Sequence, residues 1–210
     1  MTWTVCNVHV GAFNTKQTFT SSGTFVAPIS GTYRITLKGA GGGGGCGSTN
    51  SNKTTTGGAG AGEGATIETY EILTAGTSYS YVVGAGGTGT GTLYAVGGAG
   101  GNTTITVNGN EYIAGGGKGS IIYPGKGGIG TINGVAVSAG ASGSTSLSVY
   151  SGYQSDSSLM VRGGTGGGQG GDVIDGTGGV FGGGGAGTSL NGHAGTNGGD
   201  GYITFEYCNV

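Results

Sequence analysis

Glycine spacing is the feature that most constrains what this chain can fold into. Glycine fills 58 of the 210 positions, and the longest stretches without it, 12–22 and 65–75, are only about 11 residues long. Each glycine inside a helix costs roughly 1 kcal/mol relative to alanine. Neither stretch carries the i, i+3, i+4, i+7 apolar spacing of an amphipathic helix. The sequence therefore predicts almost no α-helix.

Short segments between the glycines alternate apolar and polar residues. In 32–38, Tyr33, Ile35 and Leu37 fall on one face and the polar residues on the other. This period of two, rich in β-branched and aromatic residues, is typical of half-buried antiparallel strands. Because one such segment lies near each end of the chain, we expect the ends to meet in one sheet system of an all-β sandwich. Strands are predicted at 32–38, 78–83, 103–107, 135–137, 147–149 and 202–207.

The glycine tracts admit two interpretations. They can be flexible loops, the usual state of glycine-rich segments. They can also pack as polyglycine II, an extended helix with three residues per turn whose segments approach closely because glycine has no Cβ. In that case backbone groups bond neighbouring segments, and the occasional Ala, Thr, Ser or Asn points outward. The tracts are 39–47, 57–64, 84–91, 97–101, 115–119, 163–171 and 176–187.

Three ordered segments carry a resemblance to a known family. They are 18–28 (TFTSSGTFVAP), 31–44 (GTYRITLKGAGGGG) and 198–205 (GGDGYITF). Together they resemble the glycine-rich domain at the tips of bacteriophage tail fibres and related virion proteins. More distantly, they are similar to the glycine-rich extracellular domain of certain receptor tyrosine kinases. The resemblance covers about 18–208.

This resemblance implies a jelly-roll-like, tumour-necrosis-factor-like β-sandwich whose loops expand into polyglycine II helices. Such sandwiches usually form trimers, so the resemblance implies a homotrimer. We expect an N-terminal strand or attachment segment at 1–17 and a single glycine-rich β-sandwich domain at 18–210. The chain starts at its own Met1 with no fibre shaft before it, which favours a separate polypeptide docked on a larger assembly.

Composition and charge exclude several classes of partner. The formal net charge is -2, and the seven basic residues are scattered singly, so no footprint for nucleic acid is present. No apolar run approaches the ~20 residues of a membrane-spanning helix. The first residues lack the basic and apolar regions of a signal peptide. We expect a virion protein, assembled in the host cytoplasm, with no membrane insertion.

Motifs for catalysis and cofactor binding are weak, and we expect no enzyme and no cofactor. Residues 84–89 satisfy G-x-G-x-x-G, but no helix can follow to hold a pyrophosphate. His9 and His193 have no partner at a catalytic spacing. The spacing of histidines and cysteines gives no metal signature. Asp156, with Asp172 and Asp175, is more typical of solvated loops than of a cation site.

Three cysteines, Cys6, Cys46 and Cys208, are an odd number, which argues against a secreted disulfide scaffold. Cys6 and Cys208 lie near the two ends of the chain, so a bridge between them is one alternative. Buried thiols in a protein assembled in the cytoplasm are the favoured alternative.

Tyrosine-bearing excursions between the tracts are the candidate binding loops. Tyrosine among small polar residues is the mixture that antibody paratopes use, and tyrosine rings also stack on sugars. For Tyr94 and Tyr123, packing as core residues at the ends of the tracts is an equal alternative. Ile121 and Ile122 are candidates for an interface. The candidate receptor-binding residues are Tyr94, Tyr123, Tyr150, Tyr153, Gln154 and Asp156.

Three functions remain open. The first is a phage tail-tip adhesin that binds a host surface glycan or outer-membrane protein through these loops. The second is a purely structural subunit, for capsid decoration or filament formation. The third is an ice-binding protein with a flat Thr/Ala face, against which the many tyrosines argue.

Overall fold

The computed structural model describes residues 13–46, 48–49, 55–56, 58–92, 95–121, 123–143 and 195–208. This part of the chain contains strands and no helix, and every strand pair is antiparallel. The all-β prediction is therefore confirmed. The strands are β1 (Thr15–Phe19), β2 (Gly23–Val26), β3 (Gly31–Lys38), β4 (Ser48–Thr49), β5 (Thr55–Thr56), β6 (Thr66–Leu73), β7 (Ser78–Val82), β8 (Thr103–Val107), β9 (Asn110–Ala114), β10 (Ile129–Ile132), β11 (Val135–Ala139) and β12 (Tyr202–Tyr207).

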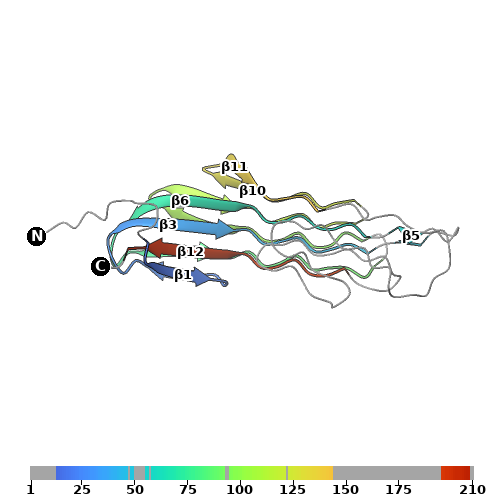
Figure 1. Ribbon diagram of the computed structural model, residues 1–210, viewed down its shortest axis with the longest axis horizontal. Coiled ribbons are helices and arrows are strands. Elements are labelled where there is room, and N and C mark those ends of the chain that lie inside the picture. The colour runs from blue at the N-terminus through green and yellow to red at the C-terminus, as the bar shows by residue number, and fades with distance from the viewer. Residues whose placement is uncertain are drawn as a thin grey trace, which may run out of the picture.

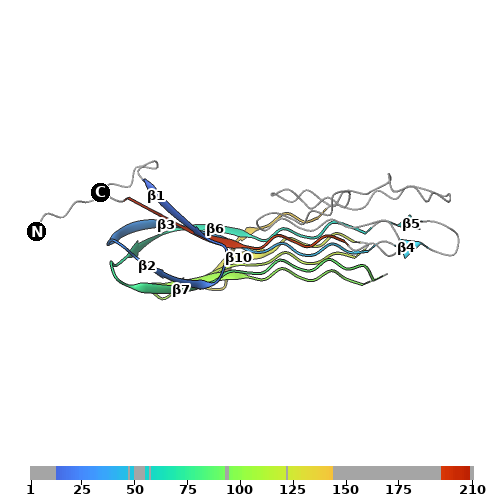
Figure 2. The same cartoon turned by 90° about the horizontal axis from the view of Figure 1, so that it is seen from below.

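Two sheets face one another and form a sandwich, as Figure 2 shows. The first sheet has the strand order β1-β12-β3-β6 and the second has the order β11-β10-β9-β8-β7-β2. β12, near the C-terminus, lies between β1 and β3, so the first and last described strands share a sheet as expected. The short β4-β5 ribbon lies apart from both sheets (Figure 1). The division at 17/18 remains a prediction, and β1 crosses it.

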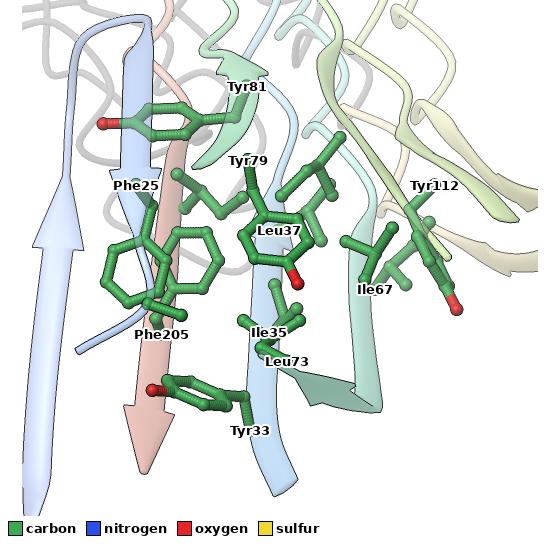
Figure 3. Close-up of a cluster of buried hydrophobic side chains, with 14 of the residues drawn as sticks. Phe25, Tyr33, Ile35, Leu37, Ile67, Leu73, Tyr79, Tyr81, Tyr112 and Phe205 are labelled. Carbon is green, nitrogen blue, oxygen red and sulfur yellow. The ribbon is translucent and has the colours of Figure 1, made fainter. Parts of the chain in front are cut away.

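The core fills the space between the two sheets (Figure 3). The predicted alternation of β3 is confirmed, because Tyr33, Ile35 and Leu37 are all fully buried. Aromatic rings dominate the β12 side, where Phe25 and Phe205 stack with ring centroids 4.0 Å apart. Such contact adds to the free energy gained from burial alone.

Asn-Gly turns close two of the hairpins. Asn108 and Gly109 connect β8 to β9 with φ of 50° and 81°, and Asn133 and Gly134 connect β10 to β11 with φ of 50° and 79°. Positive φ at both central residues is the type I′ geometry that matches strand twist and favours Asn-Gly. Both turns lie at the end of the sandwich remote from the glycine tracts, because the tracts adjoin the opposite ends of these strands.

The glycine tracts continue the strands in the order that the sheets set (Figure 1). The tracts that adjoin β12, β3 and β6 form one row, in which Gly41 N donates to Gly199 O at 2.9 Å and Gly42 N to Gly62 O at 2.9 Å. The tracts that adjoin β7 to β11 form a second row, also in strand order. The first row is 195–201, 39–46 and 58–65; the second is 84–91, 97–101, 115–120, 125–128 and 140–143.

Successive amides in one tract bond different neighbours. Gly41 N donates to the tract before β12, Gly42 N to the tract before β6, and Gly43 N to the tract before β8 at 2.8 Å. Gly44 N then returns to the first neighbour, donating to Thr196 O at 2.9 Å. A direction that repeats every third residue is the symmetry of polyglycine II. The described tracts are therefore packed polyglycine II helices and not flexible loops.

Close approach of backbones explains why these positions are glycine. A Cβ on Gly43 would stand 2.0 Å from Thr88 O, and one on Gly62 would stand 1.9 Å from Lys126 O. The expectation that the occasional Ala, Thr, Ser or Asn of a tract points outward is wrong at several positions. Ala40 and Ala61 are fully buried, and buried Ser120 accepts from Gly45 N at 2.9 Å and donates to Ala59 O.

Candidate functional site

The tips of the glycine layer lie at the end of the molecule opposite the start of β1 and the end of β12 (Figure 1). Tracts 39–46, 84–91, 115–120 and 140–143 run away from the sandwich, and the other described tracts run back. Ile121, Tyr123 and Pro124 lie between outgoing tract 115–120 and returning tract 125–128, on the side of these tracts away from the sandwich. Ile121 and Tyr123 are candidates predicted from the sequence.

Tyr123 is the one candidate tyrosine that the structure describes. Its side chain is 72% exposed, so the alternative of a core residue that closes the layer is wrong for this position. Its carbonyl accepts from Ile121 N at 3.4 Å, and Ile121 O accepts from Ala59 N at 2.8 Å. Ile121 is half-buried. The remaining candidates, Tyr94, Ile122, Tyr150, Tyr153, Gln154 and Asp156, lie outside the described residues and stay predictions.

Two lysines lie side by side on the exposed side of the second row. Lys118 N donates to Lys126 O at 2.8 Å, and both side chains are exposed. Sequence reasoning missed this pair because the basic residues are scattered singly along the chain. The repeated Gly-Lys-Gly triplet, in neighbouring tracts, was the available signal.

A buried ion pair joins the sandwich to the glycine layer. Lys38, at the end of β3, binds Glu63, the one acidic residue of tract 58–65, and both side chains are about nine-tenths buried. Lys38 Nζ also donates to Thr66 Oγ1 at 3.1 Å, and Ala141 N donates to Glu63 Oε2 at 3.2 Å. β3, tract 58–65 and tract 140–143 thus meet at this ion pair.

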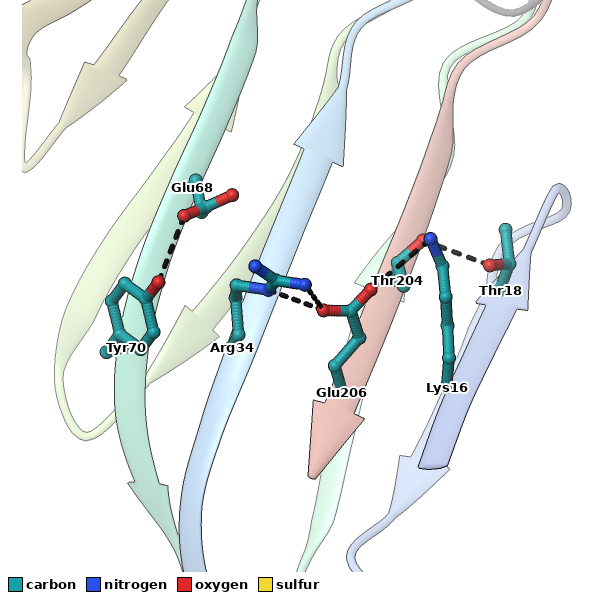
Figure 4. A network of polar contacts seen from close by, with 7 residues as sticks. All are labelled: Lys16, Thr18, Arg34, Glu68, Tyr70, Thr204 and Glu206. Atoms are coloured by element: carbon teal, nitrogen blue, oxygen red, sulfur yellow. Dashed lines mark hydrogen bonds and ion pairs between the residues drawn. The ribbon is translucent and has the colours of Figure 1, made fainter. Parts of the chain in front are cut away.

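On the outer face of the first sheet, Glu206 binds Arg34 and lies 3.3 Å from Lys16 Nζ (Figure 4). Burial alone would raise the pKa of the Glu206 carboxyl, but hydrogen bonds from Arg34 and Lys16 lower it below its ordinary value of 4.5. The hydrogen bond to Glu206 raises the pKa of Arg34. This network ties β1, β12 and β3 together.

Glu206 should make stability fall in acid. A carboxyl whose pKa is lower in the folded chain stabilises the fold above its unfolded pKa, and this contribution disappears as the pH falls through the folded pKa. We expect Glu206→Gln to flatten the decline in the free energy of unfolding below about pH 4.5. Urea titrations between pH 2 and 7 measure this. Glu68→Gln, at an exposed position of β6, is the control, and an equal flattening there would contradict the assignment.

Among the described residues, neither a metal cluster nor a dinucleotide-binding loop is formed. No group of three His, Cys, Asp or Glu side chains gathers among them. The G-x-G-x-x-G segment at 84–89 lies within a glycine helix, where Gly87 N donates to Gly41 O at 2.8 Å, so this amide is not available to a phosphate. His9, His193, Asp156, Asp172 and Asp175 lie outside the described residues.

Cys46 is a buried thiol, as the favoured alternative expected, and Cys208 is half-buried and forms no disulfide. Cys6 lies outside the described residues. In the described part of the chain, no helix is long and apolar enough to cross a membrane.

The fold defines the class of protein: an antiparallel β-sandwich extended by a layer of polyglycine II helices. The chain belongs to the glycine-rich domain family, whose pattern matches residues 19–208. Comparison with curated proteins gives no match.

Proposed function

We propose that this chain is a non-enzymatic virion protein of a bacteriophage that acts as a receptor-binding adhesin at the tail tip. In this proposal it recognises a host surface glycan or outer-membrane protein through its Tyr-bearing loops. Its place is the virion, after assembly in the host cytoplasm, where it is carried by a larger assembly as a homotrimer. Neither nucleic acid nor membrane insertion is part of its role.

The placement of Tyr123 is the observation that carries this proposal. An exposed tyrosine lies between outgoing tract 115–120 and returning tract 125–128, while β1 begins and β12 ends at the opposite end of the molecule (Figure 1). A rigid framework that presents variable loops at one end is a common arrangement for binding. The hydrogen-bonded rows supply that rigidity, since each described tract is bonded to several neighbours.

Loss of the candidate tyrosines should weaken attachment to cells. We expect Tyr123→Ala to reduce binding of the labelled protein to its host bacterium about tenfold, since exposed aromatic anchors often contribute 1–2 kcal/mol or more. Tyr150→Ala combined with Tyr153→Ala should do the same. Cell-binding titrations over a panel of bacteria measure the effect.

Tyr70→Ala is the matched control, because Tyr70 is a 45% exposed tyrosine on the outer face of the sandwich, in β6, away from the tips. Equal binding by the wild type, by Tyr123→Ala and by the Tyr150→Ala, Tyr153→Ala variant, with unchanged thermal unfolding, would contradict the loop assignment.

A structural subunit, for capsid decoration or filament formation, is the second candidate, and the edge strand β11 favours it. Val135 and Val137 are 68% and 52% exposed there, and 129–139 contains neither charge nor proline. Natural edge strands usually carry charged residues or proline, which prevent pairing with the edge of another sheet. Light scattering with electron microscopy discriminates the two: the adhesin proposal expects discrete particles, whereas filaments or sheets formed by the protein alone would favour the structural role.

A further inference from the structure

The geometry points to a site for an acidic polysaccharide at Lys118, Lys126 and Tyr123, an inference that rests on the proposed adhesin function and names its ligand class. The two lysines come from neighbouring tracts that run in opposite directions. The hydrogen bond from Lys118 N to Lys126 O, 2.8 Å long, fixes their backbones side by side. Their spacing is therefore set by the rigid layer and not by loop conformation.

Charge balance sets these two lysines apart from the other described cations. Lys16 and Arg34 both bind Glu206, and Lys38 binds Glu63. Among the described residues, no carboxylate forms an ion pair with Lys118 or Lys126. Two like charges on adjacent segments repel one another. An anion between them would relieve that repulsion.

The surroundings leave both ammonium groups accessible. Hydrogen bonds place tract 97–101 beside Lys118 and tract 140–143 beside Lys126. The exposed residues of these two tracts are alanine and serine, namely Ala99, Ala141 and Ser142. None of the five tracts in the second row contains Asp or Glu. A polymer with carboxylate or phosphate groups thus meets two exposed lysines on adjacent tracts, with neutral residues around them.

Tyr123 adjoins the site, at the bend that precedes tract 125–128. It precedes Lys126 by three residues, and Pro124 lies between them. Three residues of chain span at most about 11 Å, so the backbones of Tyr123 and Lys126 lie within that distance of one another. Both side chains are exposed. A sugar ring can stack on the tyrosine while an acidic group on the same chain binds the lysines.

General electrostatic attraction does not account for such binding. The formal net charge of the chain is -2, so the protein as a whole does not attract a polyanion. Lysine presents a compact charge with three donors, which suits carboxylate and phosphate oxygens alike. The site should therefore take acidic glycans of either kind and ignore neutral ones.

Titration of the full chain with three polymers tests the inference: polygalacturonate for carboxylates, glycerol-phosphate teichoic acid for phosphates, and dextran as the neutral polymer. We expect binding to at least one acidic polymer and none to dextran. Lys118→Gln combined with Lys126→Gln should weaken that binding at least tenfold and reduce its salt dependence. Tyr123→Ala should weaken it while leaving the salt dependence unchanged.

Lys16→Gln removes one exposed lysine from the sandwich and is the control. Equal affinity in the double lysine variant and the wild type, or no binding to either acidic polymer, would overturn the inference. Cell binding separates the two proposals. Normal attachment of the double lysine variant to bacteria would overturn the acidic site and leave the adhesin function standing. Binding to an acidic polymer without attachment to any bacterium would overturn the adhesin function and leave the acidic site standing.

Discussion

Gly43→Ala is expected to destabilise the protein by about 3 kcal/mol, because the new methyl group would meet backbone that cannot move aside. Its Cβ would stand 2.0 Å from Thr88 O and 2.3 Å from Thr88 C. Overpacking in a filled interior costs 1–3 kcal/mol and occasionally more. Here the neighbours are main-chain atoms already bonded to further tracts, so the layer has to separate locally.

Thermal unfolding measures this effect, and for a chain of this length 3 kcal/mol corresponds to a fall in Tm on the order of 10 °C. Gly31→Ala is the matched control. Gly31 lies at the start of β3, where an added Cβ meets nothing within 4 Å. Its Tm should stay within a degree or two of the wild type. A Gly43→Ala variant as stable as Gly31→Ala would mean that the tracts are not packed.

Removal of one partner from the Lys38–Glu63 pair should destabilise the fold by about 3–5 kcal/mol, since it leaves a buried charge without its counterion. Glu63→Gln leaves the Lys38 ammonium with neutral partners only, the new amide and Thr66 Oγ1 at 3.1 Å. Lys38→Met leaves the Glu63 carboxylate with the Ala141 amide, at 3.2 Å. Urea denaturation of both single variants measures the loss.

The double variant, Lys38→Met with Glu63→Gln, separates charge pairing from packing. It removes both buried charges, so we expect it to recover most of the stability that either single variant loses. Additive losses in the double variant would contradict the pairing and would assign the effect to side-chain volume.

Strands with a clean alternation were predictable from the sequence. The prediction at 32–38 matches β3 to within a residue, 103–107 and 202–207 match β8 and β12, and 78–83 and 135–137 overlap β7 and β11. The predicted strand at 147–149 lies outside the described residues. Apolar residues at every second position of a buried face supply this signal. β1 overlaps the N-terminal strand or attachment segment expected at 1–17, and the strands that were missed are β2, β4, β5, β6, β9 and β10.

β6 shows why alternation alone was insufficient. Thr69 and Glu71 pair with inward-facing Ile35 and Tyr33, whereas Tyr70 and Ile72 lie on the exposed side. The inward-facing Glu71 is bonded to the opposite sheet. Tyr112 OH donates to Glu71, and Asn108 Nδ2 donates to Glu71 at 2.8 Å. Burial, together with this hydrogen bond, raises the pKa of the Tyr112 hydroxyl.

The sequence predicts that the tracts can pack as polyglycine II, but not which tracts become neighbours. Composition indicates that segments without side chains can pack closely, but any tract can then neighbour any other. The order of the rows follows from strand pairing, which long-range contacts decide. The juxtaposition of Lys118 with Lys126 depends on that order, so the repeated Gly-Lys-Gly triplet alone did not show that the two lysines are neighbours.

Amide hydrogen exchange of the glycine tracts tests the central claim most directly, namely that they form a hydrogen-bonded polyglycine II layer. Gly41, Gly42, Gly43 and Gly44 each donate to a different residue of a neighbouring tract, at 2.8–2.9 Å. The account predicts that these amides exchange as slowly as those of Ile35 and Leu37 in β3, through global unfolding. Exchange of the glycine amides at the rate of an unstructured peptide, while the β3 amides stay protected, would contradict it.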